Sequence, residues 1–147
     1  MFYEEQILKN KEQTIAAMFQ YCRDFAADLA ELGLDKLGLY DFFDFVRAIP
    51  YRLDREGREV LARPRHIVKF KSLGMDCKKK SILCGCYFLI NNYQWRFCVS
   101  STRPDGEYHH IFPQVFLNDR WLNFDATYKH FYPFQSKKLT AAKIFYP

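Results

Sequence analysis

Apolar side chains recur at helical spacing near the start of the chain. Over residues 4–32 they share one face, the reverse face is polar, and the pattern ends near Gly33. A second apolar segment, LGLYDFFDFVRAI at 37–49, stops at Pro50. We therefore predict a helical N-terminal part spanning residues 1–49. The repeating positions of the first segment are Ile7, Leu8, Ile15, Met18, Phe19, Cys22, Phe25, Ala26 and Leu29.

The hydrophobic pattern changes twice in the middle of the chain. The stretch YRLDREGREVLARPRHIVKF at 51–70 is highly charged and is interrupted by Gly57 and Pro64, which favours an extended connection. After Gly74, an Asp precedes an apolar run at helical spacing, and this predicts a helix over about residues 77–91.

Three segments that alternate between polar and apolar residues follow this helix, as is typical of strands. The sequence TRPDGEY separates the first two and supplies turn residues. Only Asn118 and Asp119 separate the last two, which predicts a tight two-residue hairpin. The segments are YQWRFCVSS (93–101), HHIFPQVFL (109–117) and RWLNFDATY (120–128).

The order of these elements predicts an α+β fold, with N-terminal helices and a central cysteine-bearing helix packed on an antiparallel sheet. A length of 147 residues suits a single domain over residues 1–147. Its expected parts are the helical region 1–49, a core at 50–128 and an extension at 129–147. The extension carries many aromatic residues, so we expect it to pack back on the domain.

The length of the predicted hairpin loop determines which of two adjacent histidines, His109 or His110, lies on the same sheet face as Asp125. If its loop is two residues long, Leu117 faces Arg120, and His110 shares a sheet face with Asp125. The two are then diagonal neighbours about 7–8 Å apart between Cα atoms, close enough for their side chains to hydrogen-bond. His109 points to the opposite face. A three-residue loop would reverse this choice, and a lone histidine on a sheet is commonly just a half-buried residue.

Cys77 follows Asp76, a plausible N-cap, which places its thiol in the first turn of a helix. The helix dipole and free N–H groups there favour a thiolate. Lys78, Lys79 and Lys80 come next, although cations are unfavourable at this end of a helix. They either support the thiolate or an anionic substrate, or simply point into solvent.

Several features of the sequence indicate the cellular compartment in which the protein is expected. Five cysteines without a regular framework argue against a disulfide-stapled secreted domain. The first residues are polar and charged, which is unlike a signal peptide. The longest uncharged run, Ser81 to Trp95, is shorter than the ~20 residues of a membrane span. We therefore expect a cytoplasmic protein without membrane association.

A net charge of +5 permits an acidic partner without requiring one.

The remaining four cysteines give little indication of a metal-binding site. Cys84 and Cys86 lie about 200° apart around the predicted helix and cannot jointly bind one ion. A zinc site that uses one of them with His109 or His110 stays an alternative. Cys22 and Cys98 sit in apolar patterns and are expected in the core. We predict no metal and no cofactor.

Cys77, His110 and Asp125, in this order, resemble the transglutaminase-like superfamily, the permuted relatives of papain-like thiol enzymes. The matching motifs are Gly74-Met75-Asp76-Cys77, His110-Ile-Phe-Pro-Gln-Val and Phe124-Asp125-Ala-Thr127. The segments Tyr51-Arg-Leu-Asp54 and Glu59-Val-Leu-Ala-Arg-Pro64 further resemble short phage-associated members. The likeness covers roughly residues 50–128. The chain departs from these members in Cys77-Lys-Lys-Lys, where they often continue with two aspartates, and in Gln114, where a Glu is usual.

The resemblance implies a Cys-His-Asp triad that cleaves or transfers an amide through a thioester, as in a cysteine protease or transglutaminase. Cys77 is then the nucleophile, His110 the acid and base, and Asp125 its orienting group. The Cys77 backbone N–H and Tyr51 are implied oxyanion donors, and Lys78, Lys79 and Lys80 candidate substrate contacts. A protein or peptide substrate is expected, and hydrolysis is favoured over transfer to an amine. The cytoplasmic location would extend to a virion or prophage context.

Two other functions stay open. The first is a catalytically inactive transglutaminase-like protein with a structural or binding role, again phage-associated. The second is nucleic-acid binding by a basic stretch interleaved with Phe70, although a solvated basic face explains the same residues and makes this the weaker partner. The stretch contains Arg63, Arg65, Lys69, Lys71 and Lys78–Lys80. The oligomeric state is not indicated by the sequence.

Overall fold

The computed structural model describes residues 4–6, 11–54 and 59–147 of the chain, which form mixed helices and sheets. The helices are α1 (Lys11–Phe25), α2 (Ala27–Glu31), α3 (Leu39–Ala48), α4 (Pro64–Lys69) and α5 (Cys77–Ile90), with a short 3-10 turn, η1 (Lys71–Leu73). The strands are β1 (Glu4–Gln6), β2 (Glu59–Leu61), β3 (Trp95–Ser101), β4 (His110–Leu117), β5 (Arg120–Asn123) and β6 (Ala141–Phe145). The predicted α+β class is confirmed.

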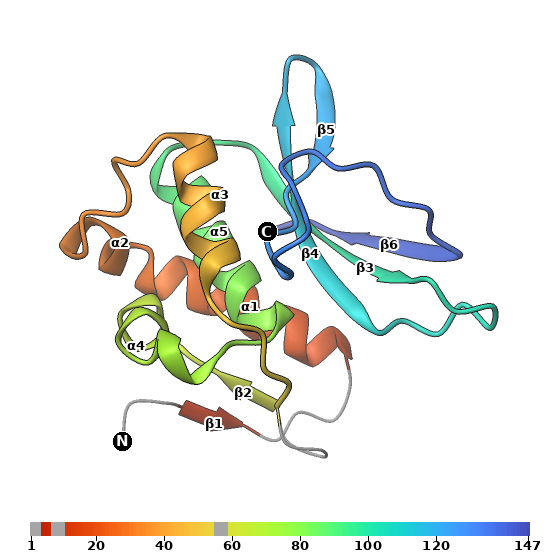
Figure 1. Cartoon of the computed structure of the whole chain (residues 1–147), viewed down its shortest axis with the longest axis horizontal. Helices are drawn as coiled ribbons and strands as arrows, with labels where there is room; N and C mark the ends of the chain where they lie inside the picture. The colour runs from red at the N-terminus through yellow and green to blue at the C-terminus, as the bar shows by residue number, and fades with distance from the viewer. Residues whose placement is uncertain (1–3, 7–10, 55–58) are drawn as a thin grey trace.

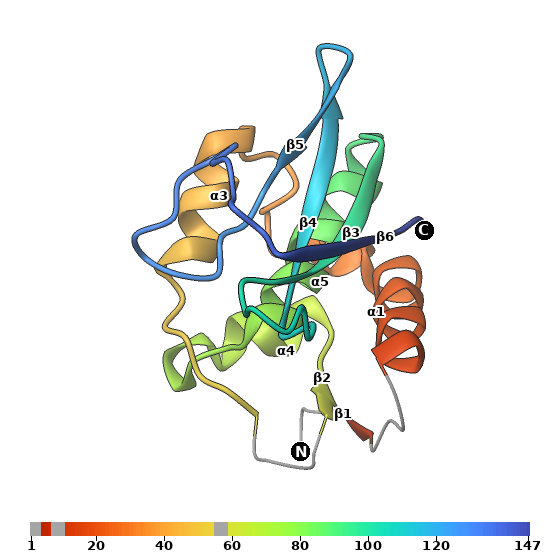
Figure 2. The ribbon, with the colours of Figure 1, turned by 90° about the vertical axis from the view of Figure 1, so that its right-hand side faces the viewer.

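The helices and the main sheet form two adjoining layers. β5, β4, β3 and β6 make a curled antiparallel sheet in that order, while β1 and β2 form a separate pair. Figure 1 shows the helices beside the main sheet, and Figure 2 shows α5 between α3 and α1. Figure 2 shows the β4–β5 hairpin extending past the helices.

Aromatic residues form much of the core around α5. Phe42 of α3 stacks on Tyr87 of α5, with ring centroids 4.1 Å apart. Phe19 of α1 stacks on Phe97 of β3 at 4.7 Å. α1 therefore packs on both the central helix and the sheet. Gly85 permits this close approach, because a Cβ at this position would lie only 2.7 Å from the Cys22 sulfur.

The predicted hairpin is confirmed, including its register. Leu117 pairs with Arg120, and the pairing continues to Gln114 opposite Asn123. Asn118 and Asp119 have φ values of +52° and +62°, as a two-residue turn with left-handed backbone requires. The register sets which side chains of β4 and β5 share a face, so it decides the position of the histidines.

The connection predicted over residues 51–70 is only partly extended. Residues 64–69 form α4, with Pro64 at the first helical turn, where its missing N–H is not needed. Ile67 is buried in the core, so tertiary packing stabilises this short helix. The prediction of an extended connection was wrong for residues 64–69. The many charged residues of this segment made its two buried apolar positions, Pro64 and Ile67, difficult to recognise as one face of a helix. Gly57 lies outside the described residues.

The N-terminal helix is shorter than predicted. α1 begins at Lys11, and Glu4–Gln6 is a strand that pairs with β2, a long-range contact that helical periodicity does not encode. Ile7 and Leu8 lie outside the described residues. At the other end, the extension packs back on the domain as expected, and it does so by adding β6 beside β3.

Candidate active site

Cys77 is the first residue of α5, as predicted. Asp76 has an extended backbone, and its Oδ1 accepts a hydrogen bond from the Lys79 backbone N–H at 3.0 Å, as an N-cap does. The Cys77 side chain is buried but borders a hollow at the surface. The backbone N–H of Cys77 lies in the first turn, where no helical carbonyl is available to it.

The chain entering α5 is held by the segment around Tyr51. Met75 donates its backbone N–H to Pro50 at 2.8 Å, and Arg52 donates to the Met75 carbonyl at 3.1 Å. Gly74 turns the chain with a φ of +87°, and a Cβ there would meet the Arg52 Cβ at 2.8 Å. Glycine is therefore required at this position of the motif, and the pairing brings Tyr51 beside the cysteine helix.

Lys78 and Lys79 form ion pairs with two aspartates, Asp76 and Asp54, next to the first turn of α5. Lys79 Nζ lies 2.6 Å from Asp54 Oδ1, and Lys78 Nζ lies 2.5 Å from Asp76 Oδ2. The Lys79 side chain is only 6% exposed and the Asp76 side chain is fully buried. The positive charges at the wrong end of the helix are thus balanced by buried carboxylates rather than by solvent.

The Lys80 side chain is buried and contacts the backbone of two other segments of the chain. Its Nζ donates to the backbone carbonyl of Ile49 at 2.5 Å and to that of Thr127 at 2.8 Å. The residue is 2% exposed, and burial lowers its pKa to about 8. The interpretation of the three lysines as solvent-facing was wrong for Lys79 and Lys80. Both are buried, and of the three consecutive lysines only Lys78 lines the hollow at Cys77.

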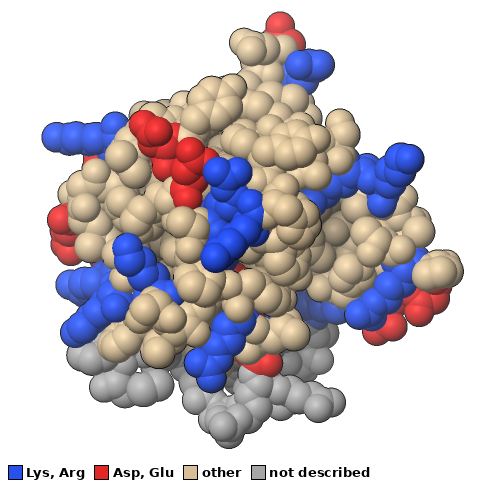
Figure 3. Space-filling model, in the orientation of Figure 1, with Lys and Arg blue, Asp and Glu red and all other residues tan. Residues whose placement is uncertain are grey.

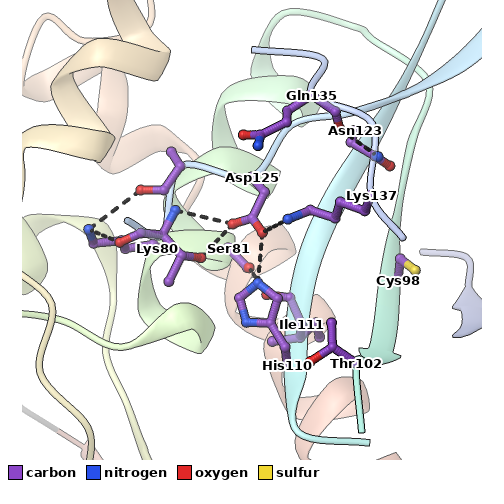
Figure 4. A network of polar contacts seen from close by, with 12 residues as sticks. Lys80, Ser81, Cys98, Thr102, His110, Ile111, Asn123, Asp125, Gln135 and Lys137 are labelled. Carbon is purple, nitrogen blue, oxygen red and sulfur yellow. Dashed lines mark hydrogen bonds and ion pairs between the residues drawn. The ribbon is translucent and has the colours of Figure 1, made fainter. Parts of the chain in front are cut away.

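His110 and Asp125 are hydrogen-bonded, with 2.7 Å between His110 Nε2 and Asp125 Oδ2 (Figure 4). The other carboxylate oxygen, Oδ1, accepts bonds from the Thr127 backbone N–H at 3.1 Å and from its hydroxyl at 2.5 Å. The Asp125 side chain is 3% exposed. The contact inferred from the hairpin register is present, and the carboxylate is fixed from both sides.

His109 is placed apart from this pair. It is exposed, and its Nε2 accepts the Thr102 backbone N–H at 3.0 Å. The side-chain alternation along β4 therefore separates the two histidines, as the two-residue loop predicts.

The surroundings of His110 and Asp125 favour the charged form of each, an imidazolium next to a carboxylate. Burial opposes protonation of His110, but the hydrogen bond to Asp125, the negative charge of Asp125 and the nearby Cys77 sulfur outweigh it and raise the His110 pKa to about 9. Burial also disfavours the charged form of Asp125, but His110 and Lys137 reverse this and lower its pKa to about 2. Because Nε2 faces Asp125, Nδ1 is the nitrogen left for Cys77.

A titration should show this shift directly. The folded-state pKa of His110, about 9, lies above the ordinary 6.5, so the folded chain binds the proton more tightly. The contribution of His110 to stability is then full below pH 6.5 and disappears as the pH rises through 9. We expect NMR titration to give this pKa, and the stability difference between wild type and His110→Ala to shrink between pH 6.5 and 9. An imidazole that titrates at 6.5 would contradict the prediction.

Lys137 is a member of the site that sequence reasoning missed. Its Nζ lies 2.8 Å from Asp125 Oδ2, the same oxygen that bonds His110 (Figure 4). The side chain is 12% exposed and lies over the ring of Phe131, with 4.2 Å from Nζ to the centroid. Nothing in the sequence around Lys137 marks it. The only available signal is that the extension contains lysines and no acidic residue.

Two hollows adjoin His110. The first is lined by Cys77, Lys78 and His110, and by Ile15 and Met18 of α1. The second lies against the extension and is lined by residues that include Tyr51, Tyr128, Lys137 and Lys138. A ligand can therefore reach the imidazole from the α1 region or from the extension.

The other cysteines are not placed at this site. Cys84 and Cys86 are buried within α5, and burial raises the pKa of each thiol well above its usual range. Cys22 and Cys98 are buried, as predicted. Over the described ranges, no three His, Cys, Asp or Glu side chains are grouped so as to hold a metal ion. The zinc alternative thus has no ligand set among these residues.

The predicted basic stretch does not form one charged face. Arg63 is paired with the buried Asp28 at 2.7 Å, and Arg65 lies 3.8 Å from Glu31. Lys79 and Lys80 point inward, as described above. On the face seen in Figure 3, Lys and Arg lie in separate groups divided by uncharged surface. Most of the positive charges in this stretch are therefore paired with carboxylates or buried.

Comparison of the chain with protein-family models, curated proteins and solved structures found no match. In the described part of the chain, no helix is long and apolar enough to cross a membrane.

Proposed function

We propose that this protein is a thiol-dependent amide hydrolase or acyltransferase of the transglutaminase-like, papain-like type, acting on a protein or peptide. The observation that carries the proposal is the hydrogen bond between His110 and the buried Asp125, in a hollow whose lining His110 shares with Cys77, the first residue of α5. A cysteine at a helix N-terminus beside an oriented imidazolium is the arrangement that activates a thiolate.

The residues suit each chemical step. The Cys77 thiolate attacks the amide carbonyl carbon, and the carbonyl electron pair moves onto oxygen. His110 gives its proton to the leaving nitrogen as the C–N bond breaks, which leaves a thioester. Water, or an amine, then attacks the thioester while His110 accepts its proton, and the thiolate leaves. The hollows beside His110 are open to solvent, which favours water as the acceptor.

Two donors are candidates for stabilising the oxyanion. The Cys77 backbone N–H lies at the positive end of α5. Tyr51 packs against Tyr128, with ring centroids 4.7 Å apart. Burial and a hydrogen bond with Tyr128 hold the Tyr51 pKa well above its usual range, so its hydroxyl keeps the proton that it would donate.

Alkylation by iodoacetamide between pH 4 and 9, resolved by peptide mass spectrometry, tests the proposal. We expect Cys77 to react fastest of the five cysteines and to stay reactive at pH 6, where a free thiol is almost wholly protonated. His110→Ala should lower its rate at pH 6 by about tenfold or more. His109→Ala, a matched change on the neighbouring residue, should leave the rate within about twofold.

The opposite result would point to an inactive relative. If Cys77 is inert at pH 6 in the wild type, or reacts equally in His110→Ala, the triad supplies no nucleophile. The protein would then be a structural or binding member of this type. If Cys77 is activated, amide substrates and amine acceptors can be compared to separate hydrolysis from transfer.

A further inference from the structure

The extension has a charge distribution that the proposed mechanism does not use. From Lys129 to Pro147 the chain contains four lysines and no Asp or Glu. Two of these lysines, Lys137 and Lys138, lie in the segment that forms a wall of the second hollow. A groove whose walls carry a single sign of charge concentrates ligands of the opposite sign.

The second hollow has room and donors for a ligand group. Its volume is about 360 Å³, and no Asp or Glu is among the residues that line it. Besides the two lysines it presents the side chains of Ser136 and Thr102, whose hydroxyl groups can donate hydrogen bonds. Tyr51 and Tyr128 form its aromatic part, next to His110.

The two lysines have different surroundings. Lys137 lies 2.8 Å from the buried Asp125 Oδ2, so its charge is already paired within the protein. Lys138 is exposed, and among the described residues no ion pair engages it.

We infer that the second hollow receives a carboxylate of the substrate, and that the protein prefers an acidic peptide as its acyl donor. The inference rests on the proposed function. His110 lines both hollows, so a substrate whose scissile amide lies at Cys77 in the first hollow would place its carboxylate in the second, close to Lys138 and the hydroxyl groups of the wall. A side-chain carboxylate and a C-terminal carboxylate share this chemistry.

Matched alkylating peptides test the inference without knowledge of the natural substrate. The probes are iodoacetyl-Glu-amide, iodoacetyl-Gln-amide and iodoacetyl-Gln with a free C-terminus. At low salt we expect a probe with a carboxylate to alkylate Cys77 about 3- to 10-fold faster than iodoacetyl-Gln-amide. Which of the two charged probes is faster identifies the source of the carboxylate. The advantage should fall at high salt.

Two variants separate this hollow from the overall charge of the protein. In Lys138→Gln the ratio of charged to neutral probe rates should fall towards one. Lys36→Gln removes the same charge from an exposed position between α2 and α3 and should keep the wild-type ratio. Equal rates for all probes in the wild type, or a ratio that survives in Lys138→Gln, would overturn the inference. If Cys77 reacts with no probe faster than a free thiol does, the proposed function itself fails.

Discussion

Replacing Lys80 with Met should lower the free energy of unfolding by about 2–4 kcal/mol at pH 7. Lys80 Nζ donates to the carbonyls of Ile49 and Thr127, which would be left without this donor. Each buried group without a partner costs about 1–3 kcal/mol, and removing a buried charge offsets part of that. Met keeps the length of the side chain, so the cavity cost stays small.

Urea unfolding followed by circular dichroism measures this loss, with Lys36→Met as the exposed control. The pH dependence gives a second test. Burial lowers the folded-state pKa of Lys80 to about 8 from the ordinary 10.5, so the unfolded chain binds more protons between these values. Wild type should therefore gain stability relative to Lys80→Met as the pH rises from 8 to 10.5. A variant as stable as wild type at pH 7 would show that these carbonyl bonds contribute nothing net.

Asp125→Asn should be the other strongly destabilising change, with a loss of about 3–5 kcal/mol. Asp125 is 3% exposed and lies within 2.8 Å of both His110 Nε2 and Lys137 Nζ. Asn has nearly the same shape but no charge, so it would leave two cationic groups facing each other in a buried site. The pKa of His110 should fall accordingly, because its hydrogen-bonded anionic partner is lost.

A double-mutant cycle with Lys137→Met isolates the cause. If repulsion between the unpaired cations dominates, adding Lys137→Met to Asp125→Asn should recover about 1–3 kcal/mol, although Lys137→Met alone destabilises wild type. Urea unfolding of the four proteins gives the coupling energy. Additive losses would mean that Asp125 acts through its bonds to His110 and Thr127 and that Lys137 contributes little to the effect.

The central part of the fold could be predicted because its signals are local. The N-cap at Asp76 and the two-residue loop at Asn118 each depend on a few adjacent residues. The loop fixes the register of β4 and β5, and the register selects His110 rather than His109 as the neighbour of Asp125. One correct turn was thus enough to bring together the imidazole and the carboxylate.

The rest depended on contacts between distant segments. β6 and β1 pair with strands far away in the sequence, and neither has a distinctive pattern of its own. The direction of Lys79 and Lys80 could not be predicted, because the partners that draw them inward are Asp54 and two backbone carbonyls from other elements. Lys137 was missed for the same reason, since Asp125 reaches it only after the extension folds back.

The division between local and distant contacts also suggests an order of assembly. α5, β3, β4 and β5 are consecutive in the chain, and short loops join most of them, so their mutual contacts cost little loop-closure entropy. The cysteine, the imidazole and the carboxylate all belong to this contiguous stretch or directly follow it. We therefore expect this stretch to form the folding nucleus, with α1 and the extension docking later as the walls of the two hollows. The reacting groups would then meet before the surfaces that select a ligand are in place.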